Sequence, residues 1–362
     1  MKGSMGMRDA IIYSGSAWET FNVPERIALA LRMLGSRVLY CEHPASILKQ
    51  SPRELREVEK GIFAFRPVFL SERLNRVAPL QSLQTSFFAK QILEKAESLQ
   101  LRKPMFFYPW LDARPALLGH VRGKFPLIHI QMDYAEPNAL AHVEPSDVTL
   151  ALPHSVYHQQ RARFGEKVKL VPQVADMGVF ETEDGSPLRP SPALDEIPRP
   201  RLGYLGPAYQ QINRPLLSEF LGNHPEWHFV SVGPAKSVPL PNAHALPWQS
   251  RHESARYAAG FDVGFMPYNC YDEEKLHCLP LKLFEYFALG LPVVATPILE
   301  LGRYQDLVYL GDTASELADA VELALREPQD SPKKARRMEI AKGHTIEILA
   351  DILGKILPLN GD

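Results

Sequence analysis

The sequence predicts an α/β protein built from two doubly wound, Rossmann-like domains that face a cleft. The chain of 362 residues is more than twice the size of a typical domain of roughly 150 residues. Short apolar strands alternate with helical patterns in both halves, which indicates mostly parallel sheets covered by helices. A proline-rich stretch separates the halves. Its five prolines fall between residues 185 and 200, a composition typical of a semi-rigid linker.

The first half begins as a strand–helix–strand unit. Residues 10–14 form a short apolar run that ends at Gly15. Pro24 suits the first turn of a helix, whose apolar residues recur at helical spacing up to Gly35. Residues 37–42 form the second strand. Further strands are expected at 105–108, 127–131, 148–152 and 168–171, and the clearest helix lies at 83–99.

The second half repeats this order. Strands are expected at 201–205, 227–232, 262–266 and 292–295, and helices at 215–221, 252–260, 281–289, 314–326 and 333–357. We therefore expect an N-terminal Rossmann-like domain (1–184), a linker (185–200), a second domain (201–340) and a C-terminal helix (341–362) that packs back on the first domain. Open parallel sheets bind ligands outside the carboxyl ends of their strands, so a ligand is expected in the cleft.

Composition excludes several functional classes. Lys and Arg total 40 against 42 Asp and Glu, a formal charge of −2, so no global attraction draws the chain to nucleic acid or to an anionic membrane. Cys41, Cys270 and Cys278 form neither a disulfide framework nor a CxxC pair, and no other spacing indicates a metal site. A polar start without a leader, and no long apolar run, predict a cytoplasmic protein.

Residues 266–296 carry the most informative pattern. Pro280 presets the entry to a helix that Gly290 ends, and Lys282 and Glu285 share one face of its first turns. The free N–H groups of a helix start hold phosphate oxygens, Lys282 adds a positive charge, and Glu285 can accept two hydroxyls of a ribose. Together these groups suit a nucleoside diphosphate. The alternative is that Lys282 and Glu285 are solvated side chains on a helix surface.

Residues 280–296, Pro-Leu-Lys-Leu-Phe-Glu-Tyr-Phe-Ala-Leu-Gly-Leu-Pro-Val-Val-Ala-Thr, resemble the signature of bacterial family-4 glycosyltransferases of the GT-B fold (glycosyl transferases group 1). Segments 201–206, 227–234 and 261–268 resemble strands of that family's donor domain, and residues 170–180 resemble the exit from its acceptor domain. The resemblance covers nearly the whole chain. It implies a retaining, metal-independent transfer of a sugar from a UDP- or GDP-linked donor to a glycan, lipid-linked or small-molecule acceptor, with no other cofactor.

The resemblance also implies site residues. Glu285 would bind the donor ribose, and Leu281, Lys282 and Leu283 the diphosphate. The turns after neighbouring strands would contribute Gly15, Gly206, Arg214, Gly233, Pro234, Trp248 and Tyr268. His277 occupies the position of the first of two family glutamates, and Tyr204 stands where an arginine is common. Arg214 is then the nearby cation, either as a phosphate ligand or as a solvated arginine at a helix start.

These departures leave two alternatives open: a non-catalytic scaffold or partner protein on the GT-B fold, and a nucleotide-sugar epimerase. The family that the chain resembles often has a polar residue near the reacting centre at the end of this apolar strand, which implies Asp133 as the first candidate catalytic residue and His129 as the second. For Asp133, an N-cap or turn acid is an equal alternative. Residues 83–102 form an amphipathic helix that either contacts the inner face of a membrane or packs inward. The sugar and the oligomeric state stay open.

Overall fold

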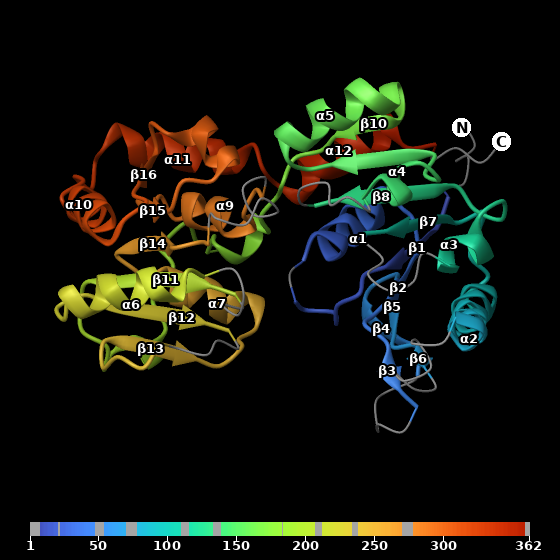
Figure 1. Cartoon of the computed structure of the whole chain (residues 1–362), viewed down its shortest axis with the longest axis horizontal. Coiled ribbons are helices and arrows are strands. Elements are labelled where there is room, and N and C mark those ends of the chain that lie inside the picture. Colours follow the sequence, from blue (N-terminus) through green and yellow to red (C-terminus); the bar gives the residue numbers. More distant parts are fainter. Residues whose placement is uncertain are drawn as a thin grey trace. The chain divides into compact units, whose positions relative to one another are not determined.

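The computed structural model describes residues 8–20, 22–47, 54–69, 78–109, 116–132, 139–182, 184–206, 212–233, 238–269 and 278–358. It divides into two compact units (Figure 1). Unit 1 contains Met1–Pro172 and Ile346–Asp362, and unit 2 contains Gln173–Thr345. Each unit is built on a mainly parallel sheet against which helices pack. The predicted α/β fold class with two such sheets is confirmed.

Unit 1 is organised around a sheet with the strand order β10-β9-β8-β7-β1-β2-β5-β4. Its strands are β1 (Ala10–Tyr13), β2 (Val38–Cys41), β4 (Arg56–Glu59), β5 (Ile62–Phe65), β7 (Met105–Tyr108), β8 (Leu127–Gln131), β9 (Val148–Ala151) and β10 (Val168–Leu170). The described strands pair in parallel, except that β4 runs antiparallel to β5 at the sheet edge. A separate pair joins β3 (Ala45–Ser46) to β6 (Val68–Phe69). The helices are α1 (Val23–Met33), α2 (Ala78–Ser98), α3 (Ala116–Val121), α4 (Ala139–Val143), α5 (His154–Phe164) and α12 (Ile346–Ile356).

Unit 2 has a parallel sheet with the order β13-β12-β11-β14-β15-β16. Its strands are β11 (Arg201–Leu205), β12 (His228–Val232), β13 (Ala243–Leu246), β14 (Val263–Met266), β15 (Val293–Ala295) and β16 (Val308–Leu310). The helices are α6 (Arg214–Asn223), α7 (Arg251–Ala258), α9 (Leu281–Ala288), α10 (Ala314–Leu325) and α11 (Pro332–Lys342). Short 3₁₀ turns are η2 (Gly165–Lys167) in unit 1 and η3 (Met177–Val179), η4 (Pro192–Leu194) and η5 (Leu299–Tyr304) in unit 2.

The predicted strands are confirmed to within one residue at each end, and those at 105–108, 127–131 and 201–205 have the observed bounds. The prediction missed β3 to β6 between residues 45 and 69, and also β13 and β16. The helical segment predicted at 333–357 is wrong as a continuous helix, because the chain leaves helical geometry between α11 and α12. There the Ala175 N–H donates to the carbonyl of His344 at 2.8 Å, and Ala175 forms a bridge with Thr345.

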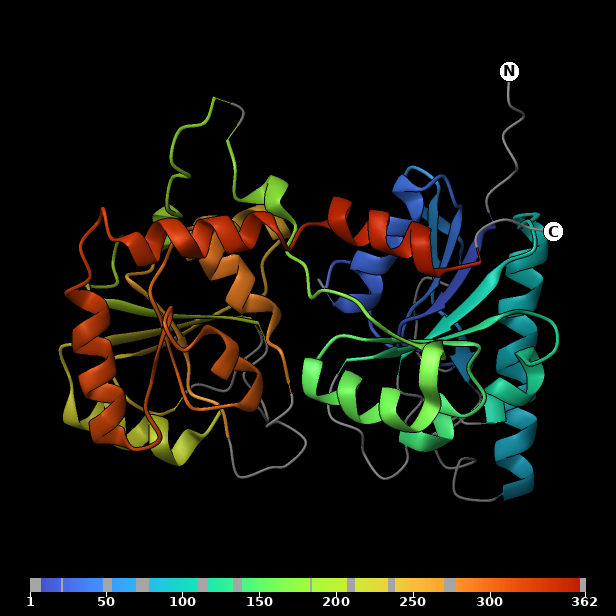
Figure 2. The same cartoon turned by 90° about the horizontal axis from the view of Figure 1, so that it is seen from above.

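The proline-rich residues 185–200 lie within unit 2. Leu194 and Ile197 are buried in its core, and the Ser191 N–H donates to the carbonyl of Arg256 at 3.1 Å. The C-terminal helix α12 belongs to unit 1, where it packs against α1 (Figure 2). Residues from both ends of the chain therefore contribute to unit 1.

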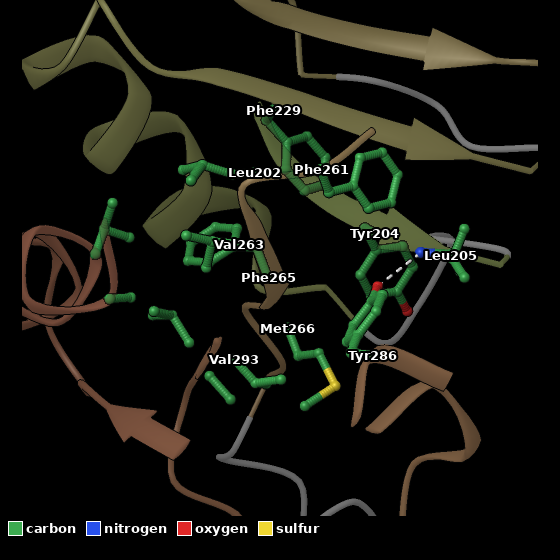
Figure 3. Packing of buried hydrophobic residues seen from close by; sticks show 14 of the residues in the cluster. Leu202, Tyr204, Leu205, Phe229, Phe261, Val263, Phe265, Met266, Tyr286 and Val293 are labelled. Atoms are coloured by element: carbon green, nitrogen blue, oxygen red, sulfur yellow. Dashed lines mark hydrogen bonds between the residues drawn. The ribbon is translucent and has the colours of Figure 1, made fainter. Parts of the chain in front are cut away.

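Large aromatic side chains fill the core of unit 2 around β11 and β14. Figure 3 shows Tyr204, Phe265 and Tyr286 among them, and all three are fully buried. Gly264 makes room for this arrangement, because a Cβ at that position would lie 2.6 Å from Cγ of Tyr286. Tyr286 comes from α9, so this contact fixes α9 closely against the centre of the sheet.

The amphipathic helix α2 packs inward. Phe88 and Ile92 are buried in the core of unit 1, together with Ala89 and Ala96. Leu83, near the start of the helix, is 60% exposed. Among the described helices, none is long and apolar enough to cross a membrane.

Candidate functional site

The carboxyl edge of the unit 2 sheet brings several of the predicted residues together. Gly206 follows β11, Gly233 follows β12, and Tyr268 follows β14. The first two lie in direct backbone contact: the Gly206 N–H donates to the carbonyl of Val232 at 2.8 Å, and a Cβ on Gly233 would lie 2.8 Å from the carbonyl carbon of Gly206. Gly233 has a φ of +142°, so a side chain here would be strained both by its conformation and by its neighbour.

Helix α9 begins at this same edge. Pro280 stands at its N-cap with extended backbone angles, and no side chain caps the helix start. The Leu283 N–H donates to the carbonyl of Pro280 at 3.2 Å, while its side chain is fully buried. The Leu283 side chain is therefore closed to a ligand and its N–H is already bonded to Pro280, so the diphosphate contact expected of Leu283 stays a prediction. The first N–H groups of a helix have no intrahelical acceptor, and they give this end of α9 a positive potential.

Two buried tyrosines hold the ammonium group of Lys282. Its Nζ donates to the hydroxyl of Tyr268 at 2.9 Å. It also lies 4.5 Å from the ring centroid of Tyr204 and 5.4 Å from that of Tyr268. Burial raises the pKa of Tyr268 well above its usual range, so the phenol stays neutral, and within the described part of the chain no carboxylate forms an ion pair with Lys282. The charge is therefore held in one place beside the start of α9.

Tyr286 links α9 to the central strand. Its hydroxyl donates to the carbonyl of Gly203 and accepts from the N–H of Leu205, both at 3.0 Å. The register between β11 and β14 ends at Gly203. Past this point the Tyr286 hydroxyl takes the place of a neighbouring strand and accepts the N–H of Leu205. Figure 3 shows the bond between Tyr286 and Leu205. Tyr286 follows Lys282 by four residues and therefore shares its face of the helix, so this contact fixes the part of α9 from which Lys282 extends.

A second set of contacts supports the segment before α9. The buried Gln173 side chain donates from Nε2 to the carbonyl of Leu279 at 3.0 Å. Nδ1 of His344 lies 2.6 Å from the carbonyl oxygen of Gln173, and the His344 ring stacks on Phe284 of α9 with centroids 3.8 Å apart. Burial lowers the pKa of His344, which favours the neutral ring. Gln173 and His344 lie 171 positions apart, so spacing along the chain did not indicate them.

Arg214 lies on a segment tied to the same edge. Ile212 forms an antiparallel bridge with Tyr268, and the Asn213 N–H donates to the carbonyl of Pro267 at 2.8 Å. The Asn213 side chain then accepts from the N–H of Leu216 and caps α6. Arg214 is the first residue of α6, half-buried, and directly follows this tied segment.

Glu285 and Trp248 are two further predicted residues on elements that reach this edge. Glu285 is half-buried and follows Lys282 by about one helical turn on α9. Trp248 follows β13 and is 40% exposed, an unusual exposure for a large aromatic ring. Among the described residues, no group of three or more His, Cys, Asp or Glu side chains is placed to hold a metal ion.

In unit 1, Gly15 follows β1 with a φ of +70°, and a polar network surrounds it. The hydroxyls of Ser14 and Tyr40 are 2.5 Å apart, and the Tyr40 hydroxyl donates to Oδ1 of Asn22 at 3.2 Å. Asn22 also accepts from the Glu25 N–H and so caps α1. This network fixes the turn at Gly15.

His129 lies in a closed environment. Its side chain is 2% exposed, and its ring lies between Tyr108 at 5.2 Å and His142 at 6.0 Å, measured between centroids. Burial lowers the pKa of His129 to about 3. The ring is thus neutral and enclosed, and its Nδ1 has no hydrogen-bond partner among the described residues; the catalytic role expected of His129 stays a prediction. Asp133, Pro234 and His277 lie outside the described residues.

Comparisons with known proteins support the architecture. No protein-family model matches the chain. Over 154 residues the chain is 29% identical to the putative teichuronic acid biosynthesis glycosyltransferase TuaH of Bacillus subtilis, a match covering 39% of this chain and 38% of that protein. The chain thus spans well under half of this curated relative's length.

Solved structures match over nearly the whole chain. Sucrose-phosphate synthase from Thermosynechococcus elongatus matches with a TM-score of 0.68 at 14% identity, covering 96% of this chain and 98% of that one. The α,α-trehalose-phosphate synthase (UDP-forming) from Burkholderia xenovorans, in complex with glucose-6-phosphate, matches with 0.68 at 11% identity over 96% and 99%. The E. coli trehalose-6-phosphate structure bound with UDP-2-fluoro glucose gives 0.67 at 11% over 96% and 98%. The chain has the GT-B fold.

Within this fold the structure gathers Lys282, Glu285, Gly206, Gly233 and Tyr268 at one sheet edge of unit 2. Sequence reasoning missed the supporting roles of the other side chains that hold α9, namely Tyr286, Gln173 and His344. Tyr286 stands inside the quoted signature, next to Glu285, and its position on a buried helix face was the available signal.

Proposed function

We propose that the protein is a retaining glycosyltransferase that moves a sugar from a nucleoside-diphosphate sugar to an acceptor hydroxyl. The observation that carries this proposal is the placement of Lys282. Its ammonium is held by Tyr268 and Tyr204 beside the uncapped start of α9, at the carboxyl edge of a parallel sheet. A fixed positive charge at a helix N-terminus is a binding site for phosphate oxygens.

In the proposed complex, unit 2 holds the donor and unit 1 the acceptor. Lys282 and the first N–H groups of α9 bind the diphosphate, and Glu285 accepts hydrogen bonds from the ribose hydroxyls. Gly206 and Gly233 allow the nucleotide to approach the backbone. The relatives support this choice of substrate, because one matched structure is bound with UDP-2-fluoro glucose and another is in complex with glucose-6-phosphate. TuaH is described as a glycosyltransferase.

The proposed reaction breaks the bond between the anomeric carbon and the diphosphate oxygen, and forms a bond from that carbon to the acceptor oxygen on the same face of the sugar. The acceptor's proton passes to the departing phosphate oxygen. The growing negative charge on the diphosphate is stabilised by Lys282 and by α9. This route needs no separate base of high pKa and, in our proposal, no metal ion.

Calorimetric titration with UDP and GDP tests the donor site. We expect one nucleotide to bind, and Lys282→Met and Glu285→Ala to weaken its binding by about tenfold or more, since each removes a charged partner of the ligand. Glu322→Ala is the matched control, because this acid lies on α10 and pairs with Arg326 at 2.7 Å. If neither nucleotide binds at millimolar concentration, the proposal fails and a scaffold role replaces it.

Product analysis tests the reaction class. With the nucleotide sugar that binds and a panel of sugar and sugar-phosphate acceptors, we expect a glycoside whose anomeric configuration in the NMR spectrum equals that of the donor. Activity that persists in a chelator supports the metal-free route. An altered nucleotide sugar formed without any acceptor would instead indicate an epimerase, and an inverted product would refute retention.

A further inference from the structure

A buried carboxylate with two guanidinium groups lies at the carboxyl edge of the unit 1 sheet. Glu42 directly follows β2, and its side chain is 1% exposed. Arg56 of β4 places Nη2 at 2.5 Å and Nη1 at 3.3 Å from its two oxygens, and Nε of Arg66, just after β5, lies 3.5 Å away. The Glu42 carboxylate also accepts the N–H of Trp18 at 2.8 Å.

The positions of the two arginines follow from strand pairing. Cys41 of β2 pairs with Phe65 of β5, and the Glu42 N–H donates to the carbonyl of Phe65 at 3.0 Å. Arg66 directly follows β5 and therefore lies beside Glu42. Arg56 reaches the same place from β4, which is hydrogen-bonded to β5. All three charged groups thus meet where the strands end.

A similar cluster lies at the opposite edge of the same sheet and shows what a purely structural arrangement is like. Asp9 precedes β1 and is fully buried, with Nη2 of Arg37 at 2.7 Å and Nε of Arg102 at 3.9 Å. Arg37 also donates to the backbone carbonyls of Leu99 at 2.9 Å and Gln100 at 2.6 Å. Its donors are therefore used within the protein.

The Glu42 cluster is different in this respect. Among the described residues, the side-chain hydrogen bonds of Arg56 all go to Glu42, and Arg66 contacts the carboxylate through Nε. The side chains of Arg56 and Arg66 are 39% and 31% exposed. One carboxylate faces two guanidinium groups, so this trio carries one positive charge in excess. Each guanidinium has five N–H donors, more than these contacts use, and both side chains are partly exposed.

We propose that Arg56 and Arg66 form a subsite for an oxyanion, a phosphate or a carboxylate, carried by the acceptor. That the ligand is the acceptor rests on the proposed glycosyl transfer, whereas the subsite itself does not. Planar guanidinium groups bind both oxyanions in a two-point fashion, and open α/β sheets bind ligands at this edge. Glu42 holds the two forks and, through Trp18, also holds the turn that follows Gly15.

The test is titration of the full-length chain with inorganic phosphate and, separately, with glucuronate. Both are run on the Lys282→Met background, because phosphate can also bind beside α9. We expect Arg56→Gln and Arg66→Gln each to weaken binding by roughly fivefold, the upper range for exposed ion pairs, and the double variant to abolish it. The preferred anion identifies the acceptor's charged group.

Arg102→Gln is the control, since it removes the same charge from the cluster around Asp9 and should leave the affinity unchanged. Circular dichroism of each variant verifies the fold. Equal affinities in the Arg56, Arg66 and Arg102 variants, or no binding of either anion, would overturn the subsite. Binding of UDP or GDP is measured separately, on the chain with Lys282 intact. If neither nucleotide binds while anion binding still requires Arg56 and Arg66, the subsite stands and the proposed transferase function fails.

Discussion

Replacing Tyr286 by Phe removes one oxygen atom and leaves the aromatic ring in place. The ring remains packed against Gly264 at the centre of the sheet. The lost hydroxyl is the partner of two buried backbone groups of β11, the Gly203 carbonyl and the Leu205 N–H, each at 3.0 Å. The register between β11 and β14 covers Leu202 and Gly203 and ends before Leu205, so on this side of β11 the Leu205 N–H relies on the phenol.

The cost follows from these two groups. A buried donor or acceptor left without a partner costs about 1–3 kcal/mol, so the variant should lose on the order of 2–4 kcal/mol of the stability of unit 2. For a unit of this size, the melting temperature should fall by roughly 4–16 °C. We also expect weaker nucleotide binding, since the same hydroxyl fixes α9 below Lys282.

Hydrogen exchange and calorimetry measure both effects. In Tyr286→Phe the amide of Leu205 should exchange far faster than in the wild type, and the melting transition of unit 2 should move down. Tyr257→Phe is the matched control, because Tyr257 is 4% exposed and no described residue hydrogen-bonds to its hydroxyl. A loss below about 0.5 kcal/mol, the usual size of a neutral substitution, with unchanged exchange at Leu205, would refute the reasoning.

Two further predictions concern unit 1 and the glycine contact. The pKa of His129 is about 3 in the folded chain and about 6.5 in the unfolded chain. Between these pH values the unfolded chain binds a proton at His129 that the folded chain does not. The free energy of unfolding should therefore fall as the pH drops from 6.5 toward 3. His129→Leu should flatten this loss, as measured by urea unfolding at pH 7 and pH 4; parallel losses in both proteins would contradict it. Gly233→Ala should cost about 1–3 kcal/mol and weaken nucleotide binding, because its Cβ would meet the Gly206 carbonyl in a strained backbone. Gly222→Ala on α6, where the added Cβ has open space, should be neutral or stabilising in the same unfolding assay.

The parallel strands were predictable because buried strands are short apolar runs. Residues 105–108 read Met-Phe-Phe-Tyr and 127–131 read Leu-Ile-His-Ile-Gln, and both are completely buried. The edge strand β4 reads Arg-Glu-Val-Glu and is half-exposed, so its sequence resembles a charged loop. The break between α11 and α12 was also missed, although Gly343, a residue type common at the ends of helices, stands at the C-cap of α11. The chain there also pairs with Ala175, far away in the sequence.

In the candidate site, too, local features could be predicted from the sequence and tertiary contacts could not. Local spacing places Lys282 and Glu285 on one helix face, and an N-cap proline indicates where α9 begins. The side chains that hold Lys282 come from β11 and from the end of β14, and the support from His344 comes from the end of unit 2. Such contacts depend on the tertiary fold, which the order of residue types along the chain does not specify.

Gly264 of β14 and Tyr286 of α9 are packed so closely that the residue at one position limits which residues the other position tolerates. Any replacement of the glycine takes the volume that the phenol ring occupies, and any smaller residue at 286 opens a hole in the middle of the sheet. Either change alone should be harmful, while a larger residue at 264 combined with a smaller one at 286 can recover the packing. Related chains are therefore expected to vary at these two positions together, and a library randomised at both should return mainly compensating pairs.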